Sequence, residues 1–278
     1  MALPFIPSDA ALLALQAAVV AAPRPVARVA WLERFRGRGW ALVPIGSIVL
    51  VVFAIRYVSD TATGLTDLAL VSVPILAAIA LGWAMRGARP LAGLAAIPLF
   101  VVAWASKNTL AGEAAGAILS ALSCVTLGVL LSAVTPAKWL KVGILLMAAA
   151  DVWLVVSDLL QSPNAALVAA QPPAGLPQLQ SEIFGTVSMG YGDLFVAALL
   201  GAVLASQWRR QWQAALLTLA IAAVFDLLFL VISELPATVP VALALVVTEG
   251  WQWWRQRRLS AVRRRPSMRA DAIPRQAR

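Results

Sequence analysis

Nine apolar segments, most of them close to the length that crosses a lipid bilayer, are the feature that most constrains how this chain can fold. A spanning helix needs ~20 mainly apolar residues. Eight segments approach that length, at residues 40–58, 68–85, 91–105, 114–134, 142–160, 184–205, 214–232 and 239–254. A ninth, residues 10–22, is shorter and contains Gln16. Because 61% of the 278 residues are apolar and 13% charged, we expect an all-α, polytopic, integral membrane protein with about nine transmembrane helices.

The positions of the basic residues predict the orientation of this bundle. If nine segments span, alternate loops and the C-terminal tail place 20 of the 22 Lys and Arg residues on one side, leaving Arg56 and Lys107 on the other. Positively charged loops remain cytoplasmic. The C-terminus is therefore expected to be cytoplasmic, and the N-terminus and the proline-rich loop at residues 161–180 outside. This distribution suits a membrane surface better than nucleic acid.

The chain divides into three predicted regions. Residues 1–139 form N-terminal scaffold helices in the membrane, and residues 140–254 contain the membrane helices with the candidate catalytic groups. Residues 255–278 are rich in arginine, with Pro266 and Pro274, and are expected to be a disordered basic cytoplasmic tail near anionic headgroups.

The absence of histidine restricts the chemistry available to the chain. It excludes Ser-His and Cys-His nucleophiles and zinc held by imidazoles. Lys107, Lys138 and Lys141 lie at the borders of apolar segments, which argues against a Ser-Lys pair. We expect neither a metal nor a cofactor, and the carboxylates remain as acid-base groups.

Three aspartates lie well inside apolar segments, whereas Asp158 and Glu249 lie near segment ends, where they can reach water. A charged group inside a bilayer costs roughly 2.5 to 3.5 kcal/mol on insertion scales, so each requires a partner or a function. After Asp193, residues 194–207 make an apolar helix of ~21 Å that ends at the basic border, and Asp151 lies ~15 Å from Lys141. The two carboxyls occupy consecutive antiparallel segments at overlapping depth. For the third, Asp226, we expect a protonated carboxyl hydrogen-bonded across helices rather than a catalytic role.

Two carboxyls held together away from water cannot both ionise. One keeps a proton, so the pair holds an acid and a base at the same time. One carboxylate can activate water while the other protonates a peptide carbonyl. Asp151 and Asp193 are therefore predicted to form the catalytic pair of an aspartic endopeptidase.

The motifs around these residues resemble the presenilin and signal peptide peptidase family of intramembrane aspartyl proteases. Gly190-Tyr191-Gly192-Asp193 is similar to the Gly-x-Gly-Asp motif of the family. The run that begins at Asp151 is similar to the first aspartate motif. Pro236-Ala237-Thr238 resembles the Pro-Ala-Leu element. Ala150 stands where the family has tyrosine, and Thr238 where it has leucine. The resemblance covers residues 140–254. It implies a presenilin-like fold and substrate-binding roles for Gly190, Gly192, Pro236 and Ala237.

The predicted orientation matches signal peptide peptidase and is the reverse of presenilin. The resemblance then implies transmembrane or signal-peptide substrates with a cytoplasmic N-terminus, cleaved within the helix. It does not specify accessory subunits.

Two other functions remain open. A proton-coupled transporter could use Asp151, Asp193 and Asp226 as a relay. The sequence Thr186 to Asp193 also looks like a potassium channel filter, but the helix that follows it is too short for the inner helix of a channel.

Overall fold

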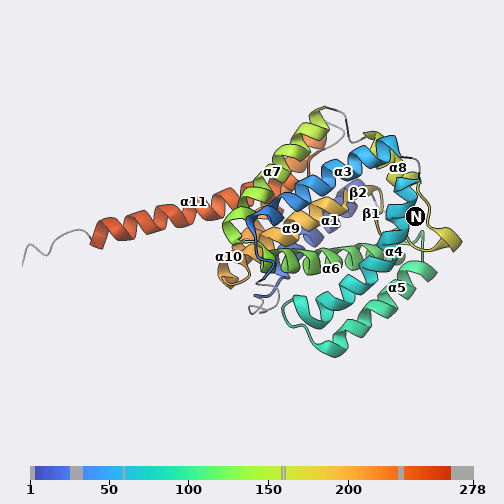
Figure 1. The fold of residues 1–278 in the computed structure, drawn as a ribbon, viewed down its shortest axis with the longest axis horizontal. Coiled ribbons are helices and arrows are strands. Elements are labelled where there is room, and N and C mark those ends of the chain that lie inside the picture. Colours follow the sequence, from blue (N-terminus) through green and yellow to red (C-terminus); the bar gives the residue numbers. More distant parts are fainter. Residues whose placement is uncertain are drawn as a thin grey trace, which may run out of the picture.

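The computed structural model describes residues 4–25, 34–58, 60–157, 159, 161–230 and 235–263. It is 80% helical and nearly all-α, which agrees with the expected class. The first part of the chain contains α1 (Phe5–Ala21), η1 (Arg38–Leu42), α3 (Val43–Tyr57), α4 (Thr61–Ile79), η2 (Ala80–Ala84), η3 (Pro90–Ala95), α5 (Ala96–Ala105) and α6 (Leu110–Val134). The second part contains α7 (Ala137–Val156), α8 (Gln161–Ala169), η4 (Pro173–Gly175), β1 (Ser181–Phe184), β2 (Val187–Gly190), α9 (Tyr191–Leu204), α10 (Trp208–Phe225), η5 (Asp226–Leu230) and α11 (Thr238–Arg263) (Figure 1).

Five helical stretches among the described residues are long and apolar enough to cross a membrane: Arg38–Tyr57, Thr61–Ala84, Leu110–Val134, Ala137–Val156 and Trp208–Leu228. Three apolar helices are shorter: Phe5–Ala21, Pro90–Ala105 and Tyr191–Leu204. The structure thus agrees with a polytopic membrane protein, while the count of nine spans is not confirmed.

One predicted span begins with a β-hairpin rather than a helix. Within the apolar run at residues 184–205, the helix begins at Tyr191, and the preceding residues form β2, which pairs antiparallel with β1. The turn between the strands contains Gly185 at φ 63°, a backbone conformation that glycine adopts without strain. The hairpin leaves α9 with 14 residues, Tyr191–Leu204.

The loop expected at residues 161–180 contains a short helix, α8. Pro163 is its third residue. A proline in the first turn is tolerated because its missing N–H would have no partner inside the helix. The prolines therefore do not break every helix in this loop, contrary to the expectation from their number.

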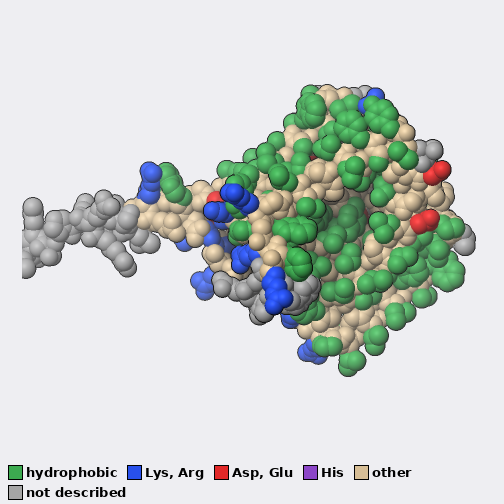
Figure 2. Space-filling view, in the orientation of Figure 1, with side chains coloured by type: hydrophobic (Ala, Val, Ile, Leu, Met, Phe, Trp, Pro, Cys, Tyr) green, Lys and Arg blue, Asp and Glu red, His purple; other side chains and the backbone are tan. Residues whose placement is uncertain are grey.

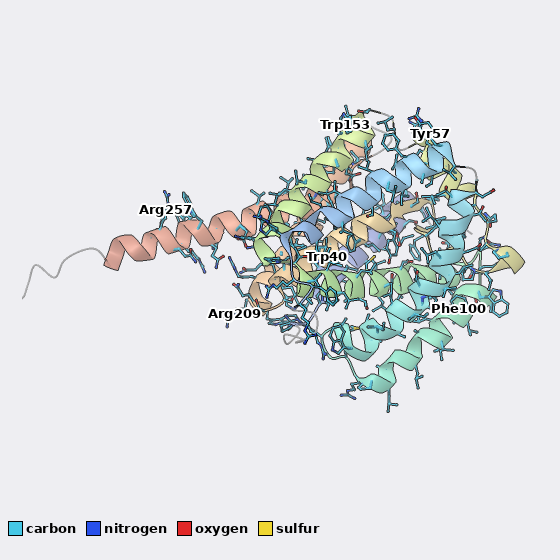
Figure 3. The ribbon with its side chains drawn as sticks, in the orientation of Figure 1. Trp40, Tyr57, Phe100, Trp153, Arg209 and Arg257 are labelled. Atoms are coloured by element: carbon cyan, nitrogen blue, oxygen red, sulfur yellow. The ribbon has the colours of Figure 1, made fainter. Side chains whose placement is uncertain are left out.

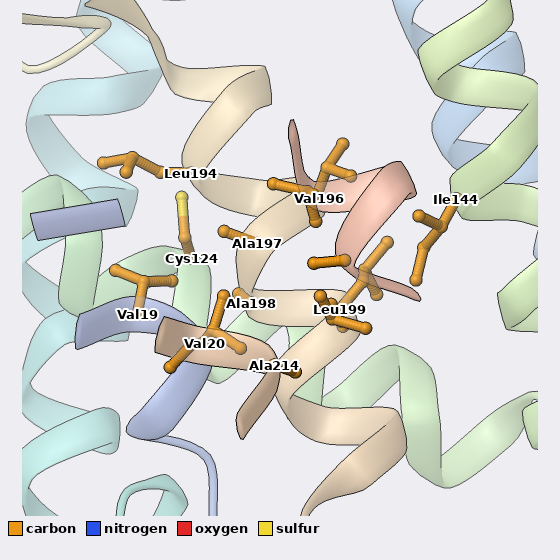
Figure 4. Packing of buried hydrophobic residues seen from close by; sticks show 14 of the residues in the cluster. Val19, Val20, Cys124, Ile144, Leu194, Val196, Ala197, Ala198, Leu199 and Ala214 are labelled. Carbon is orange, nitrogen blue, oxygen red and sulfur yellow. The ribbon is translucent and has the colours of Figure 1, made fainter. Parts of the chain in front are cut away.

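Helix α9 is the centre of the bundle and is enclosed by α1, α6, α7, α10 and α11 (Figure 1). From Val196 to Gly201 every residue is buried. The close-up in Figure 4 shows Leu194, Val196 and Leu199 of α9 among Val20 and Ile144. Because α9 carries Asp193 in its first turn, this packing holds the aspartate in a fixed place.

Close helix contacts with α9 depend on glycine. A Cβ at Gly128 of α6 would lie 2.9 Å from the backbone of Ala198, and a Cβ at Gly201 would lie 2.3 Å from the carbonyl oxygen of Val20. Real Cβ atoms do not approach so closely. In membrane proteins, small residues allow helices to approach to backbone contact. Gly201 and Gly128 therefore allow α1 and α6 to pack directly on α9.

A polar cluster ties the chain together at one end of the bundle. The buried side chain of Gln211 donates hydrogen bonds to the carbonyl oxygens of Val20 (3.0 Å) and Pro23 (2.9 Å). Its amide oxygen accepts from Arg86 (Nη2, 2.6 Å), and Arg86 also donates to the carbonyl of Ala205. One side chain of α10 thus joins α1 to the segment that follows η2.

We expect Gln211→Leu to lower the free energy of unfolding by about 2 to 4 kcal/mol. The substitution leaves the carbonyls of Val20 and Pro23 without their donor, and each unsatisfied buried group costs about 1 to 3 kcal/mol. Thermal unfolding in detergent measures the change. Gln213, exposed on the same helix, is the control, because Gln213→Leu should change stability by less than about 0.5 kcal/mol. Equal stabilities of the two variants would contradict the role assigned to the cluster.

The last helix continues beyond the bundle. Helix α11 runs to Arg263, so residues 255–263 are helical where we expected a disordered tail, and residues 264–278 lie outside the described part. Arg257 lies 3.6 Å from the ring of Trp253, and Arg258 lies 3.5 Å from that of Trp254. These contacts, together with the good helix propensity of arginine, favour a continued helix.

Most Lys and Arg side chains on the visible face gather toward the end from which α11 extends (Figure 2). In Figure 3, Trp40 and Arg209 lie near this end, and Tyr57 lies at the opposite one. The bundle therefore has one basic end, as a positively charged cytoplasmic side requires. The orientation of the termini in a membrane stays a prediction.

Candidate active site

Asp151 lies in the last two turns of α7 and is held by a side chain from the start of α11. The hydroxyl of Thr238 donates a 2.6 Å hydrogen bond to Asp151 Oδ2. Thr238 is buried, whereas Asp151 is partly exposed. The Asp151 carboxyl is thus fixed on one side and accessible on another.

Asp193 is the third residue of α9 and lies at the N-terminal end of that helix. Its Oδ2 accepts a 3.1 Å hydrogen bond from the backbone N–H of Gly190, the last residue of β2. A helix N-terminus favours a negative group because the first N–H groups point toward it. A Cβ at Gly190 would lie 3.1 Å from Asp193 Oδ2. Glycine at this position therefore gives the carboxyl room to cap the helix.

The fold brings these two carboxyls together. Helix α7 packs against α9, and the carboxyls of Asp151 and Asp193 are close enough for the charge on one to act on the other. The two residues are 42 positions apart in the sequence, since 193 minus 151 is 42. Because like charges close together in low dielectric disfavour one another, ionisation of one carboxyl disfavours ionisation of the other.

The proline element lies beside the pair. Thr238, which follows Pro236 and Ala237, contacts Asp151 directly. The carbonyl oxygen of Ala237 accepts a 2.9 Å hydrogen bond from Nε2 of Gln16, a buried side chain of α1. The polar residue that interrupts the first apolar segment thus anchors the backbone next to the candidate site.

The two motif glycines differ in their surroundings. Both are exposed. Gly190 is limited by the Asp193 carboxyl, whereas a Cβ at Gly192 would meet no atom within 4 Å. Space beside Gly192 is therefore open in this structure, which is compatible with the approach of another chain.

Asp226 lies apart from the pair, at the end of α10. Its carboxyl lies near that of Asp9 on α1, close enough for the two groups to interact. A bond between two carboxyl groups requires a proton on one of them, because an ionised carboxylate is only an acceptor. This contact supplies the partner across helices that the sequence did not identify.

Glu182 lies near the site and is not marked by any pattern in the sequence. It lies in β1, opposite Met189, and is almost completely buried. Neither of its carboxyl oxygens has a hydrogen bond of good geometry to a described residue. Burial, followed by the charge of Asp193, raises the pKa of Glu182 to about 8. The Gly185-Thr186 pair between apolar residues could have indicated the hairpin, but not the burial of Glu182.

Because Glu182 keeps its proton in the folded protein up to a pH of about 8, we expect stability to fall as the pH rises from about 5 to about 8. In the unfolded chain the carboxyl loses its proton near its ordinary pKa of 4.5, so over this range the unfolded state binds fewer protons. Glu182→Gln should remove this dependence and stabilise the protein at pH 8 by a few kcal/mol. The upper limit is about 1.4 kcal/mol for each unit by which folding raises the pKa of Glu182.

Thermal unfolding of both proteins in detergent at pH 5, 6.5 and 8 measures this effect. Parallel pH dependences of the wild type and the Gln variant would contradict it.

No group of three or more His, Cys, Asp or Glu side chains suited to a metal ion occurs in the described ranges. A cavity of about 320 Å³ lies elsewhere, between η1 and the first half of α7, and is lined by Arg38, Gly39, Ala41, Leu42, Trp139, Val142, Gly143 and Leu146. It includes none of the candidate site residues.

The chain was compared with family models, with curated proteins and with solved structures, and none of them matches it. The functional assignment therefore depends on the site itself and on the motif resemblance.

Proposed function

We propose that this chain is an intramembrane aspartyl endopeptidase that hydrolyses peptide bonds within transmembrane helices or signal peptides. The observation that carries the proposal is the pairing of Asp151 and Asp193 on packed helices, inside a bundle whose helices are long and apolar enough to span a membrane. The proline element at Pro236 and Ala237 beside this pair adds support.

The pair supplies the groups that hydrolysis needs. One carboxylate takes a proton from water as the water oxygen attacks the carbonyl carbon, and the carboxylic acid gives its proton to the carbonyl oxygen. When the resulting gem-diol collapses, the carboxylic acid gives its proton to the amide nitrogen, the carboxylate takes a proton from a gem-diol hydroxyl, and the C–N bond breaks to give an amine and a carboxylic acid. The carboxyls then share one proton as before.

Gly190, Gly192, Pro236 and Ala237 are assigned to substrate binding. Gly190, the last residue of β2, and Gly192, the second residue of α9, are both exposed and lie beside Asp193 in the chain. The proline element lies on the Asp151 side of the pair, where the Thr238 hydroxyl bonds to Asp151. An intact helix shields its own carbonyls through hydrogen bonds, so the substrate must open locally before these groups can receive it.

The position of Asp226 favours proteolysis over the proton-coupled transporter. A relay would use Asp226 in line with the other two aspartates, but Asp226 pairs with Asp9 instead. The strand conformation of Val187–Gly190, paired with β1, likewise gives no support to a potassium filter.

The proposal is tested by reconstituting the purified chain in liposomes with a model transmembrane helix. We expect fragments cut within the helix, and no ion flux that depends on Asp193. An uncut substrate together with Asp193-dependent flux would overturn the proposal in favour of transport.

Orientation predicts which substrates are cut. If the basic end is cytoplasmic, the enzyme should cut a helix whose N-terminus is cytoplasmic at least about tenfold faster than the same helix inserted the other way. The handedness of the site fixes the direction in which the peptide is read. Proteoliposomes with each substrate orientation measure the ratio. Equal rates, or the reverse preference, would defeat the prediction of orientation but leave the aspartyl chemistry in place.

A further inference from the structure

We propose that Thr238 is a positioning residue that holds the Asp151 carboxyl in its reactive orientation. This inference rests on the proposed function and adds to it a residue that the motif resemblance does not assign, because the resembling element has leucine at this place.

The hydrogen bond between Thr238 and Asp151 joins residues 87 positions apart in the sequence. At 2.6 Å between the two oxygens, it is as short as O–H···O⁻ bonds usually are. Oδ2 accepts the hydroxyl proton. We assign to the other oxygen of Asp151 the proton shared with Asp193 and the contact with the attacking water.

The hydroxyl is itself held in place. Thr238 is the first residue of α11, where a hydroxyl can also turn to the backbone of its own helix. Here the hydroxyl donates to α7 instead. The preceding carbonyl, that of Ala237, is fixed by Gln16, and the N–H of Val239 donates to Pro236. A chain of contacts from α1 through α11 thus ends on Asp151.

A purely structural explanation is that Thr238 only fills space and satisfies its own buried hydroxyl. Thr238→Val and Thr238→Ser distinguish the two explanations. Valine has the shape of threonine without the donor, and serine has the donor without the methyl group. The backbone N–H of Thr238, which also contributes a hydrogen bond to Asp151, is kept in both variants, so partial orientation remains.

We expect Thr238→Val to lower kcat on the model helix by about 10- to 100-fold, the factor that corresponds to loss of one hydrogen bond to a charged group. KM should stay within about twofold, because the contact orients a reacting group rather than the substrate. Thr238→Ser should keep kcat within about threefold of the wild type. The control is Thr248→Val on the same helix, where a buried hydroxyl donates to the carbonyl of Ala244; its kcat should match the wild type.

Equal kcat in Thr238→Val and the wild type, or equal losses in the Val and Ser variants, would overturn the inference. Infrared spectroscopy gives a readout that does not depend on activity. The carboxyl bands of Asp151, identified by their loss in Asp151→Asn, should shift in Thr238→Val and remain in place in Thr238→Ser. An unshifted band overturns the inference even if the wild type cuts no substrate, whereas a shifted band with an inactive wild type supports the contact and rejects only the protease assignment.

Discussion

Asp151→Asn and Asp193→Asn are each expected to lower kcat for cleavage of a transmembrane helix by at least about a thousandfold. Asparagine keeps the shape of aspartate but can neither take a proton from water nor return one, and positioned acid-base groups contribute about 10² to 10⁴ each. Because the two carboxyls act as one unit, the double variant should be no slower than either single variant. Cleavage rates of the reconstituted variants test this.

Asp226→Asn is the matched control for this prediction. Asp226 lies in an apolar segment like the other two, but pairs with Asp9. An amide can still hydrogen-bond to Asp9, so kcat should stay within a few-fold of the wild type. Loss of cleavage in only one of Asp151→Asn and Asp193→Asn would indicate a single functional carboxylate. A loss in Asp226→Asn as severe as in those two variants would favour the proton relay of a transporter.

Gly201→Val is expected to prevent correct packing of the bundle. The first side-chain carbon would lie 2.3 Å from the carbonyl oxygen of Val20 and 3.0 Å from Pro23, and neither backbone can move without disturbing the contacts of Gln211. Overpacking of a dense core costs typically 1 to 3 kcal/mol and more where backbone must shift. We expect a loss of about 3 kcal/mol or more, seen as a low yield of monodisperse protein and a lower unfolding temperature in detergent.

Gly64→Ala provides the matching control, since a Cβ at this position in α4 meets no atom within 4 Å. Alanine is better than glycine inside a helix by about 0.5 to 1 kcal/mol, so this variant should be as stable as the wild type or more so. If Gly201→Val folded with wild-type stability, the direct contact of α1 with α9 would be wrong.

Hydrophobic composition predicted the helices well because each apolar residue contributes to the same signal. It failed at residues 184–190, where a short apolar run cannot distinguish a strand from a helix by composition. Here Gly185 and the β-branched residues Thr186 and Val187 favour a hairpin. It also failed at residues 255–263, where charge suggested disorder, although arginine is a good helix former.

The candidate site could be predicted as far as its aspartates, because the cost of a carboxyl in lipid marks Asp151 and Asp193 individually. The residues that hold them could not be predicted in the same way. The contact of Thr238 with Asp151 depends on the depth and rotation of α11 against α7, and the burial of Glu182 depends on how the hairpin packs. These are tertiary relations between segments far apart in the chain, and no local pattern encodes them.

The most direct test of the central claim, that this pair of carboxyls hydrolyses a peptide bond within a membrane helix, is mass spectrometry of the cleavage products formed in ¹⁸O-labelled water. The wild type should give fragments whose new ends lie inside the apolar span, with one ¹⁸O atom in the new carboxyl group. Neither Asp151→Asn nor Asp193→Asn should give them. Cleavage confined to residues outside the span, or the same fragments at the same rate from both Asn variants, would contradict the account.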